Sequence, residues 1–148
     1  VGQTEGYLAG LLIFELKSRG ASGSSFPPIV AAAANSSLPH YRPGETLVQR
    51  DQPLLFDWGA VYKGYCSDLT RTFVVGRASA RIKQIYRVVF EAQQEAIKFL
   101  RPGVTTMQAD RVARPGGGGC RRVCATAYAG APRLTRRCVA DGARDGGE

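Results

Sequence analysis

Apolar residues recur at helical spacing in three segments of the chain. Residues 4–19 carry leucines three or four positions apart, with Thr4 at the start and Gly20 after the end. Residues 80–100 carry an apolar stripe with a period near 3.6, opposed by basic and amide side chains, which predicts an amphipathic helix. A third helix is predicted over residues 106–114, where Thr105 or Thr106 can cap the first turn.

Shorter apolar runs predict strands. Residues 29–34 form such a run after a turn-rich segment, and we expect a buried strand there. Residues 53–61 and 65–75 are two longer strand-like runs on either side of Lys63-Gly64, a pair suited to a tight turn because glycine accepts a positive φ. Helices combined with an antiparallel hairpin indicate an α+β fold.

The composition changes abruptly near residue 115. The 148 residues include 44% apolar and 22% charged side chains, which is ordinary for a globular domain, and the length suits one domain. Residues 115–148 instead hold eight of the 18 glycines, with no periodicity. Such a segment buries too little apolar surface to offset the cost of ordering it. We therefore expect a folded part over residues 1–114 and a poorly ordered basic tail.

Location and partners are only loosely bounded by the sequence. The most apolar stretch, residues 8–16, is interrupted by Gly10 and Glu15, and falls short of the ~20 residues that span a bilayer. No signal peptide precedes the four cysteines, so reduced thiols in a cytoplasmic protein without membrane contact are expected. A helix that begins almost at Val1, without an initiating methionine, indicates a piece of a longer protein.

Two carboxylates interrupt the predicted hairpin. Asp57 and Asp68 occupy strand positions where branched and aromatic residues are preferred. If the turn is centred on Lys63-Gly64, Asp68 faces Gly59 and lies diagonal to Asp57, about 7–8 Å away or less. A turn shifted by one residue would instead place the two carboxylates directly opposite each other. Both registers keep them on one face of the sheet.

Two close like charges on a half-buried sheet repel each other unless a cation lies between them. An oxygen-only pair suits hard or borderline divalent ions such as Mn²⁺, Mg²⁺ or Fe²⁺. The alternative is that both aspartates are solvated, or bonded to neighbouring Ser, Thr or Arg71 side chains. His40 is the only histidine, which excludes from this chain every site that needs two imidazoles.

Two sequence motifs follow each other along the chain, FPPIVAAAANSSLPHYRPGE and then LLFDWGAVYKGYCSDLTRTFVVG. They resemble the pita-bread metallopeptidase family, and within it the Xaa-Pro branch of aminopeptidase P and prolidase. Their order and spacing are those of the family, and the similarity extends over about residues 1–114. The resemblance implies an incomplete pita-bread fold, in which helices cover one face of an antiparallel sheet. It also implies a metal-dependent aminopeptidase that removes an N-terminal residue, commonly one that precedes proline.

The resemblance assigns roles to individual positions. Asp57 matches the aspartate that binds one metal ion, and Asp68 matches the aspartate that bridges both ions of a dinuclear centre. His40 matches the histidine that contacts the peptide substrate near the scissile bond and assists proton movement. In the complete family enzyme two divalent ions, Mn²⁺, Co²⁺ or Zn²⁺, activate water and polarise the peptide carbonyl.

The family's remaining metal ligands, one histidine and two glutamates, come from the second half of its domain. Residues 1–114 match only the N-terminal half, and the tail holds no histidine and only Glu148 as a glutamate. With two of five ligands we expect at most one weakly bound ion and no activity of the chain alone. The unpaired edge of a half-domain also predicts self-association, as a homo-oligomer or an aggregate.

Other functions and other origins of the tail remain as alternatives. The chain could be a non-catalytic pita-bread binding module, but the presence of Asp57, Asp68 and His40 together favours an enzyme. The tail could bind nucleic acid, but it lacks repeated RGG units and interleaved aromatic residues. Its composition is also what translation of a GC-rich gene in a wrong reading frame would produce.

Overall fold

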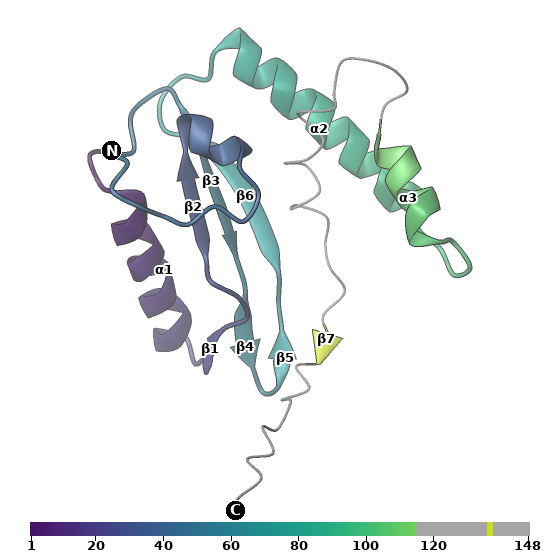
Figure 1. Ribbon diagram of the computed structural model, residues 1–148, viewed down its shortest axis with the longest axis horizontal. Helices are drawn as coiled ribbons and strands as arrows, with labels where there is room; N and C mark the ends of the chain where they lie inside the picture. The colour runs from purple at the N-terminus through teal and green to yellow at the C-terminus, as the bar shows by residue number, and fades with distance from the viewer. Residues whose placement is uncertain (115–135, 138–148) are drawn as a thin grey trace, which may run out of the picture.

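The computed structural model describes residues 1–114 and the strand at residues 136–137. Figure 1 shows the elements in chain order, which are α1 (Glu5–Ser18), β1 (Gly23–Ser24), β2 (Ile29–Ala32), the 3-10 helix η1 (Ala33–Ser37), β3 (Pro53–Trp58), β4 (Ala60–Tyr62), β5 (Tyr65–Cys66), β6 (Leu69–Val74), α2 (Ala80–Phe99), α3 (Thr106–Ala113) and β7 (Arg136–Arg137). Helices and antiparallel strands are mixed, so the α+β class is confirmed. The expectation of a poorly ordered tail falls on residues outside the described part of the chain.

The strands form two antiparallel ladders. One has the order β2-β3-β6 and the other the order β1-β4-β5-β7. The turn between β4 and β5 is the predicted one, because Tyr62 pairs with Tyr65 and leaves Lys63 and Gly64 as a two-residue loop. Lys63 and Gly64 have φ angles of 48° and 79°, and two positive φ angles are what a primed hairpin turn requires.

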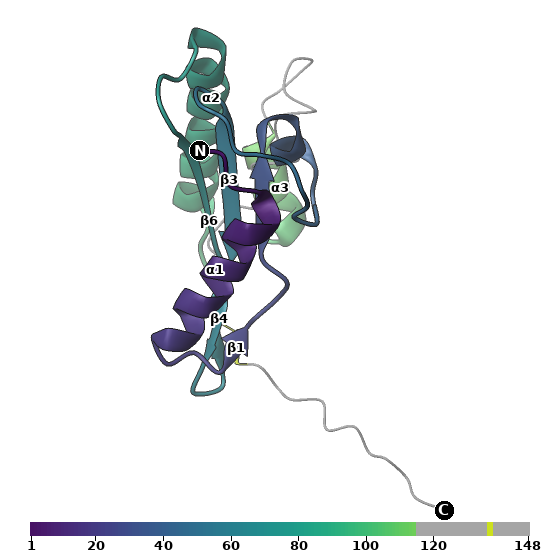
Figure 2. The same ribbon diagram turned by 90° about the vertical axis from the view of Figure 1, so that its left-hand side faces the viewer.

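The buried core lies between α1 and the β2-β3 ladder. On β2 and β3 the side chains that face α1 alternate with those on the other side, and those of Val30, Ala32 and Leu54 are almost fully buried. Ala9 of α1 completes this cluster together with Val48 from the loop before β3. The helix runs along the sheet, beside β2 in Figure 1 and nearest the viewer in Figure 2.

The N-terminus of α1 is tied to the loop that precedes β3. Thr4 caps the helix, since its hydroxyl accepts a hydrogen bond from the Tyr7 amide at 3.1 Å. The amide of Glu5 donates to the Thr46 carbonyl at 3.0 Å, and the amide of Gly6 donates to the Gly44 carbonyl at 2.9 Å. Residues 44–46 are therefore held directly against the first turn of α1.

The two later helices begin and end close to the predicted positions. The Ser79 hydroxyl caps α2 by accepting from the Ile82 amide at 3.2 Å. Thr105, not Thr106, caps α3, where it forms a reciprocal capping box with Gln108. The apolar stripe of α2 is only half-buried, and no residue of α2 is fully buried.

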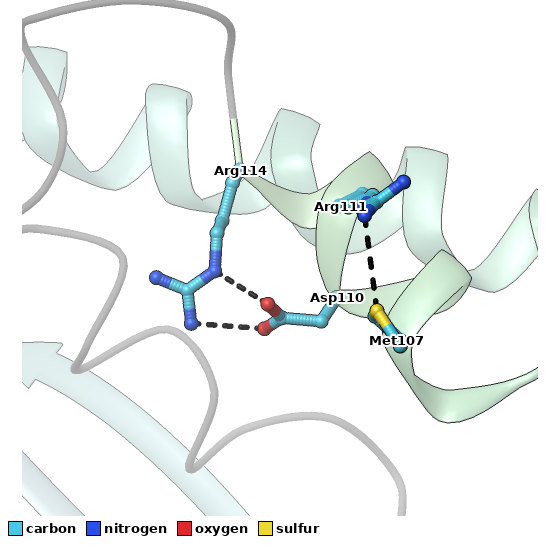
Figure 3. Close-up of polar contacts among 4 residues, drawn as sticks. All are labelled: Met107, Asp110, Arg111 and Arg114. Carbon is cyan, nitrogen blue, oxygen red and sulfur yellow. Dashed lines mark hydrogen bonds and ion pairs between the residues drawn. The ribbon is translucent and has the colours of Figure 1, made fainter.

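The last turn of α3 carries a paired acid and base. The Arg114 guanidinium donates two hydrogen bonds to the Asp110 carboxylate, at 2.6 and 3.0 Å (Figure 3). The hydrogen bond from Arg114 lowers the pKa of Asp110 below its ordinary value of 3.8. The Arg111 side chain points to the sulfur of Met107, one turn earlier on the same helix. These contacts lie on the surface, at the C-terminal end of the described residues 1–114.

Candidate active site

Asp57 is a buried carboxylate in the middle of the three-stranded ladder. It lies on β3, where it pairs with Ile29 of β2 and Thr70 of β6, and only 8% of its surface is exposed. Neighbouring positions of a strand alternate between faces, so Asp57 lies on the face opposite to the one that Leu54 and Phe56 turn toward α1. The strand therefore places an acid where water is largely excluded and the helix does not reach.

Asp68 is half-buried in the segment between β5 and β6. The pairs Asp57–Thr70 and Val61–Cys66 follow one register on either side of it, and this register sets Asp68 opposite Gly59. The first of the two predicted registers is thus the correct one. Asp57 and Asp68 occupy diagonal positions on one face rather than directly opposed positions.

Both strands of the hairpin are interrupted next to these aspartates, which corrects the prediction of continuous strands over residues 53–61 and 65–75. Ser25 approaches the hairpin here: its amide donates to the Gly59 carbonyl at 3.1 Å, and its hydroxyl donates to the Ser67 carbonyl at 2.8 Å. The Ser67 hydroxyl then replaces that carbonyl as the acceptor for the Ala60 amide, at 2.9 Å. The ladder breaks because a third segment competes for its hydrogen bonds.

Gly59 is required by this close approach. A Cβ atom built on Gly59 would collide with the Ser67 carbonyl oxygen and the Ser25 hydroxyl, and would lie 2.9 Å from the Ser67 carbonyl carbon. No side chain fits here unless the backbone of Ser67 shifts, and Asp68 is the next residue along the chain. The glycine thus allows three chain segments to meet between the two aspartates.

His40 stands apart from the strands, in the loop after η1. Its side chain is exposed, and its backbone has φ of 56°, in the left-handed region that few residues other than glycine adopt. Within the described residues, no group of three or more histidine, cysteine, aspartate or glutamate side chains is arranged to hold a metal ion. The structure therefore aligns Asp57 and Asp68 but does not bring His40 into a metal cluster with them.

The two aspartates fit part of a metal site. Oxygen donors on one face, one of them buried, suit a hard or borderline divalent cation, because a cation offsets the cost of burying negative charge. Among the described residues, no third carboxylate, histidine or cysteine joins Asp57 and Asp68 in such a site. An ion held here would need further ligands from water or from residues outside the described part.

Glu5 is a buried acid in the first turn of α1, where the sequence pattern predicts only the start of a helix. Its side chain is fully buried, and its carboxylate accepts hydrogen bonds from the Ala32 amide at 2.7 Å, the Asn35 amide group at 3.0 Å and the Tyr41 hydroxyl at 2.7 Å. A longer contact of 3.4 Å comes from the Gly44 amide. An acid in the first turn of a helix is expected for electrostatic reasons alone, so no local signal revealed its burial.

These contacts shift the acidity of both partners. Burial acts to raise the pKa of Glu5, but the hydrogen bonds from Ala32, Asn35, Tyr41 and Gly44 outweigh it and hold the pKa below its ordinary value of 4.5. The hydrogen bond to Glu5, with burial, raises the pKa of the Tyr41 hydroxyl above 10.0. Glu5 is therefore an ionised carboxylate at neutral pH, and Tyr41 is a protonated donor to it.

Cys66 departs from expectation. It lies half-buried on β5, where it pairs with Val61 and, through a contact distant in sequence, with Arg136 of β7. It is disulfide-bonded, so the reduced thiol expected from the sequence is wrong for this residue. The pairing of β5 with β7 joins two segments that are far apart in the sequence, so local sequence pattern does not predict it. Among the described residues no helix is both long and apolar enough to cross a membrane.

Comparisons with known proteins agree on one family. A family model described as metallopeptidase family M24 matches residues 1–115. The chain is 44% identical over 113 residues to the uncharacterized peptidase YqhT of Bacillus subtilis, and 36% identical over 113 residues to a Xaa-Pro dipeptidase of Pyrococcus horikoshii. Each alignment covers 76% of this chain and 32% of the relative, so the chain spans about a third of the length of these proteins.

Solved structures give the same result. The crystal structure of an X-Pro aminopeptidase from Thermotoga maritima superimposes with a TM-score of 0.74 at 38% identity, covering 76% of this chain and 32% of that one. A recombinant prolidase from Thermococcus sibiricus superimposes with a TM-score of 0.73 at 40% identity, covering 76% and 31%. At these identities the likeness extends beyond the fold to the sequence that forms it.

Proposed function

Because the chain belongs to metallopeptidase family M24, we propose that it carries part of the active site of a metal-dependent peptidase of the Xaa-Pro type. The family and the pita-bread fold inferred from the two sequence motifs are confirmed. The proposal rests chiefly on one observation, which is the register that sets buried Asp57 and half-buried Asp68 on one face of the sheet. Similarity to proteins named Xaa-Pro dipeptidase and X-Pro aminopeptidase supports a peptide substrate with proline in second position.

In this proposal residues 1–114 form the N-terminal half of the catalytic domain. Asp57 and Asp68 hold divalent cations, for which Mn²⁺, Co²⁺ and Zn²⁺ are the candidates. A bound ion of this kind supplies Lewis acidity and lowers the pKa of water. Burial in the sheet leaves only 8% of Asp57 exposed, so a bound cation would offset the cost of burying this carboxylate.

His40 has the complementary role. An exposed imidazole can reach a peptide, donate a hydrogen bond to it and pass a proton between its two ring nitrogens and the substrate. Its constrained backbone sets the direction of the side chain from the loop. We assign to His40 contact with the substrate and movement of a proton, and no metal binding.

The described residues alone provide too few ligands for efficient catalysis. Two carboxylates hold a single ion weakly, because affinity depends on a full and preorganised ligand set. The purified chain with Mn²⁺ is therefore expected to show no cleavage of Xaa-Pro peptides above a metal-free blank. Turnover that disappears in Asp68→Ala would show that the chain assembles a working centre.

Metal binding by the two aspartates is tested by titrating Mn²⁺ and following the free ion by electron paramagnetic resonance. We expect one weak site in the wild-type chain, at least tenfold weaker in Asp57→Asn and in Asp68→Asn, and unchanged in Asp110→Asn, which alters an aspartate on distant α3. Binding that is the same in all four proteins would refute the assignment of Asp57 and Asp68.

Thermal melts add a second measure. Without metal, Asp68→Asn is expected to leave the melting temperature unchanged or to raise it, because removal of one of two neighbouring charges relieves repulsion. A ligand that binds only the folded state raises the melting temperature, and the increase grows with the ratio of the free ligand concentration to its dissociation constant. If micromolar Mn²⁺ stabilises the wild type by several degrees and leaves Asp68→Asn unaffected, the chain holds a complete site and the expectation of a weak half-site is wrong.

A further inference from the structure

We propose that Glu5 is a positioning residue that fixes the loop carrying His40. The loop runs over residues 33–46 between β2 and the segment that leads to β3, and His40 lies at its exposed part. The inferred importance of His40 rests on the proposed function. The link between Glu5 and the loop does not, because it follows from contacts within the described residues.

The Glu5 carboxylate joins both ends of this loop. One oxygen, Oε1, accepts from the Ala32 amide at the end of β2 and from Asn35 Nδ2 in η1, at 2.7 and 3.0 Å. The other, Oε2, accepts from the Tyr41 hydroxyl at 2.7 Å and more weakly from the Gly44 amide at 3.4 Å. Donors before and after His40 thus converge on one buried side chain.

Asn35 and Tyr41 add a contact of their own across the loop. Asn35 Nδ2 donates to the Tyr41 hydroxyl at 2.8 Å, so the two residues are held to each other as well as to Glu5. Tyr41 follows His40 directly. A fixed Tyr41 therefore limits the backbone freedom of His40, whose left-handed φ of 56° requires support from its surroundings.

Among the described residues, few other contacts hold this part of the loop; one of them joins Asn35 Nδ2 to the Thr46 hydroxyl at 3.2 Å. Leu38, Pro39 and His40 are exposed, so apolar burial contributes little to their order. Gly44 and Thr46 are bonded to α1 through the main chain, and the Leu38 amide donates to the Asn35 carbonyl at 3.0 Å at the end of η1. The contacts that hold Tyr41 are made by its side chain. The hydrogen bonds to Glu5 are strong because its carboxylate is charged, and a hydrogen bond to an ionised carboxylate is stronger than one between neutral groups.

The proposal is tested with Glu5→Gln, which keeps the size and shape of the side chain but removes its charge. The substitution also replaces one carboxylate oxygen by an NH₂ group, which cannot accept hydrogen bonds from the donors around it. Its matched control is Glu15→Gln, which neutralises a partly exposed acid of the same helix paired only with Arg19 at the surface. Both are made in the complete 148-residue chain, labelled with ¹⁵N, without metal. The backbone order parameters of His40 and Tyr41 and the hydrogen exchange of the Ala32 amide are measured by NMR.

In Glu5→Gln we expect exchange of the Ala32 amide to accelerate at least tenfold, and the order parameter of His40 to fall from the rigid range near ~0.85 to below ~0.6. Amides in β3 and β6 should keep their protection, which distinguishes loss of loop order from general unfolding. Glu15→Gln should match the wild type. A His40 backbone as rigid in Glu5→Gln as in Glu15→Gln would overturn the proposal.

Tyr41→Phe provides a second test should Glu5→Gln fail to fold, because it removes one donor and leaves the carboxylate its other partners. It should lower the order parameter of His40 while the Ala32 amide keeps its exchange rate; an unchanged His40 would again overturn the proposal.

The peptide Ala-Pro is then added to the wild type, where the imidazole signal is unique because the chain has one histidine. Absence of any shift in that signal counts against the proposed role of His40 and leaves the Glu5 result untouched.

Discussion

Replacement of Gly59 by alanine isolates the contact that separates the two ladders. The substitution adds one methyl group at a buried position whose φ is not in the left-handed region, so the backbone of alanine is not strained by its torsion angle. The cost comes from sterics alone. The new Cβ meets the Ser67 carbonyl oxygen, which is main chain, and the Ser25 hydroxyl, which can rotate away.

The magnitude follows from what must move. Overpacking by a methyl group in a filled site costs about 1–3 kcal/mol. Relief of the clash separates Ser25 from Ser67, whose 2.8 Å hydrogen bond is then lost, and such a bond contributes about 0.5–1.5 kcal/mol. Together these give a destabilisation of roughly 2–4 kcal/mol, a large part of the ~5–15 kcal/mol by which domains are stable.

Urea unfolding followed by circular dichroism measures this loss. For a slope of about 1–3 kcal/mol per molar, a loss of roughly 2–4 kcal/mol should lower the midpoint by roughly 0.7–4 M. Gly10→Ala is the control, because Gly10 is an exposed residue of α1 and no neighbouring atom lies within 4 Å of the place that its methyl group would take. Alanine should stabilise that helix by about 0.5–1 kcal/mol. The double variant Ser25→Ala/Gly59→Ala should recover only part of the loss, since the Ser67 carbonyl remains in the way. A Gly59→Ala chain within about 0.5 kcal/mol of the wild type would refute the reasoning.

Three further predictions concern the core, the buried acid and α3. Leu54→Ala should destabilise the chain by about 2–5 kcal/mol because it leaves a cavity against α1, whereas truncation of exposed Leu38 should change urea stability by less than about 0.5 kcal/mol. The pKa of Glu5 is lowered in the folded state, so its stabilising contribution is present above the ordinary value of 4.5 and is lost as the pH falls through the folded pKa; unfolding midpoints measured from pH 7 to pH 3 should fall less steeply in Glu5→Gln than in the wild type. Arg114→Ala should return the pKa of Asp110 toward 3.8, measured by NMR titration of the carboxyl carbon, and an unchanged pKa would contradict the pairing at the end of α3.

Much of the secondary structure was predictable because its causes are local. The stripe over residues 80–100 predicts α2 to within a residue or two, since side chains three and four apart share one face of a helix. The Lys63-Gly64 pair predicts the hairpin turn. The position of this turn sets the register, which places Asp57 and Asp68 on one face of the sheet at diagonal positions. The sequence could not choose between two turn positions, and the φ angles of Lys63 and Gly64 decide between them.

What only the tertiary structure decided depends on contacts between distant segments. Ser25 reaches Ser67 across 42 positions and interrupts two strands that local pattern predicts as continuous. Tyr41 reaches Glu5 across 36 positions and makes a buried anchor of an acid that local pattern treats as an ordinary helix start. Hydrophobic period and turn chemistry describe interactions within a few residues, so they determine the helices and the presence of the hairpin. The burial of a carboxylate and the breaking of a ladder depend on which remote segment approaches, and that is known only once the chain has folded.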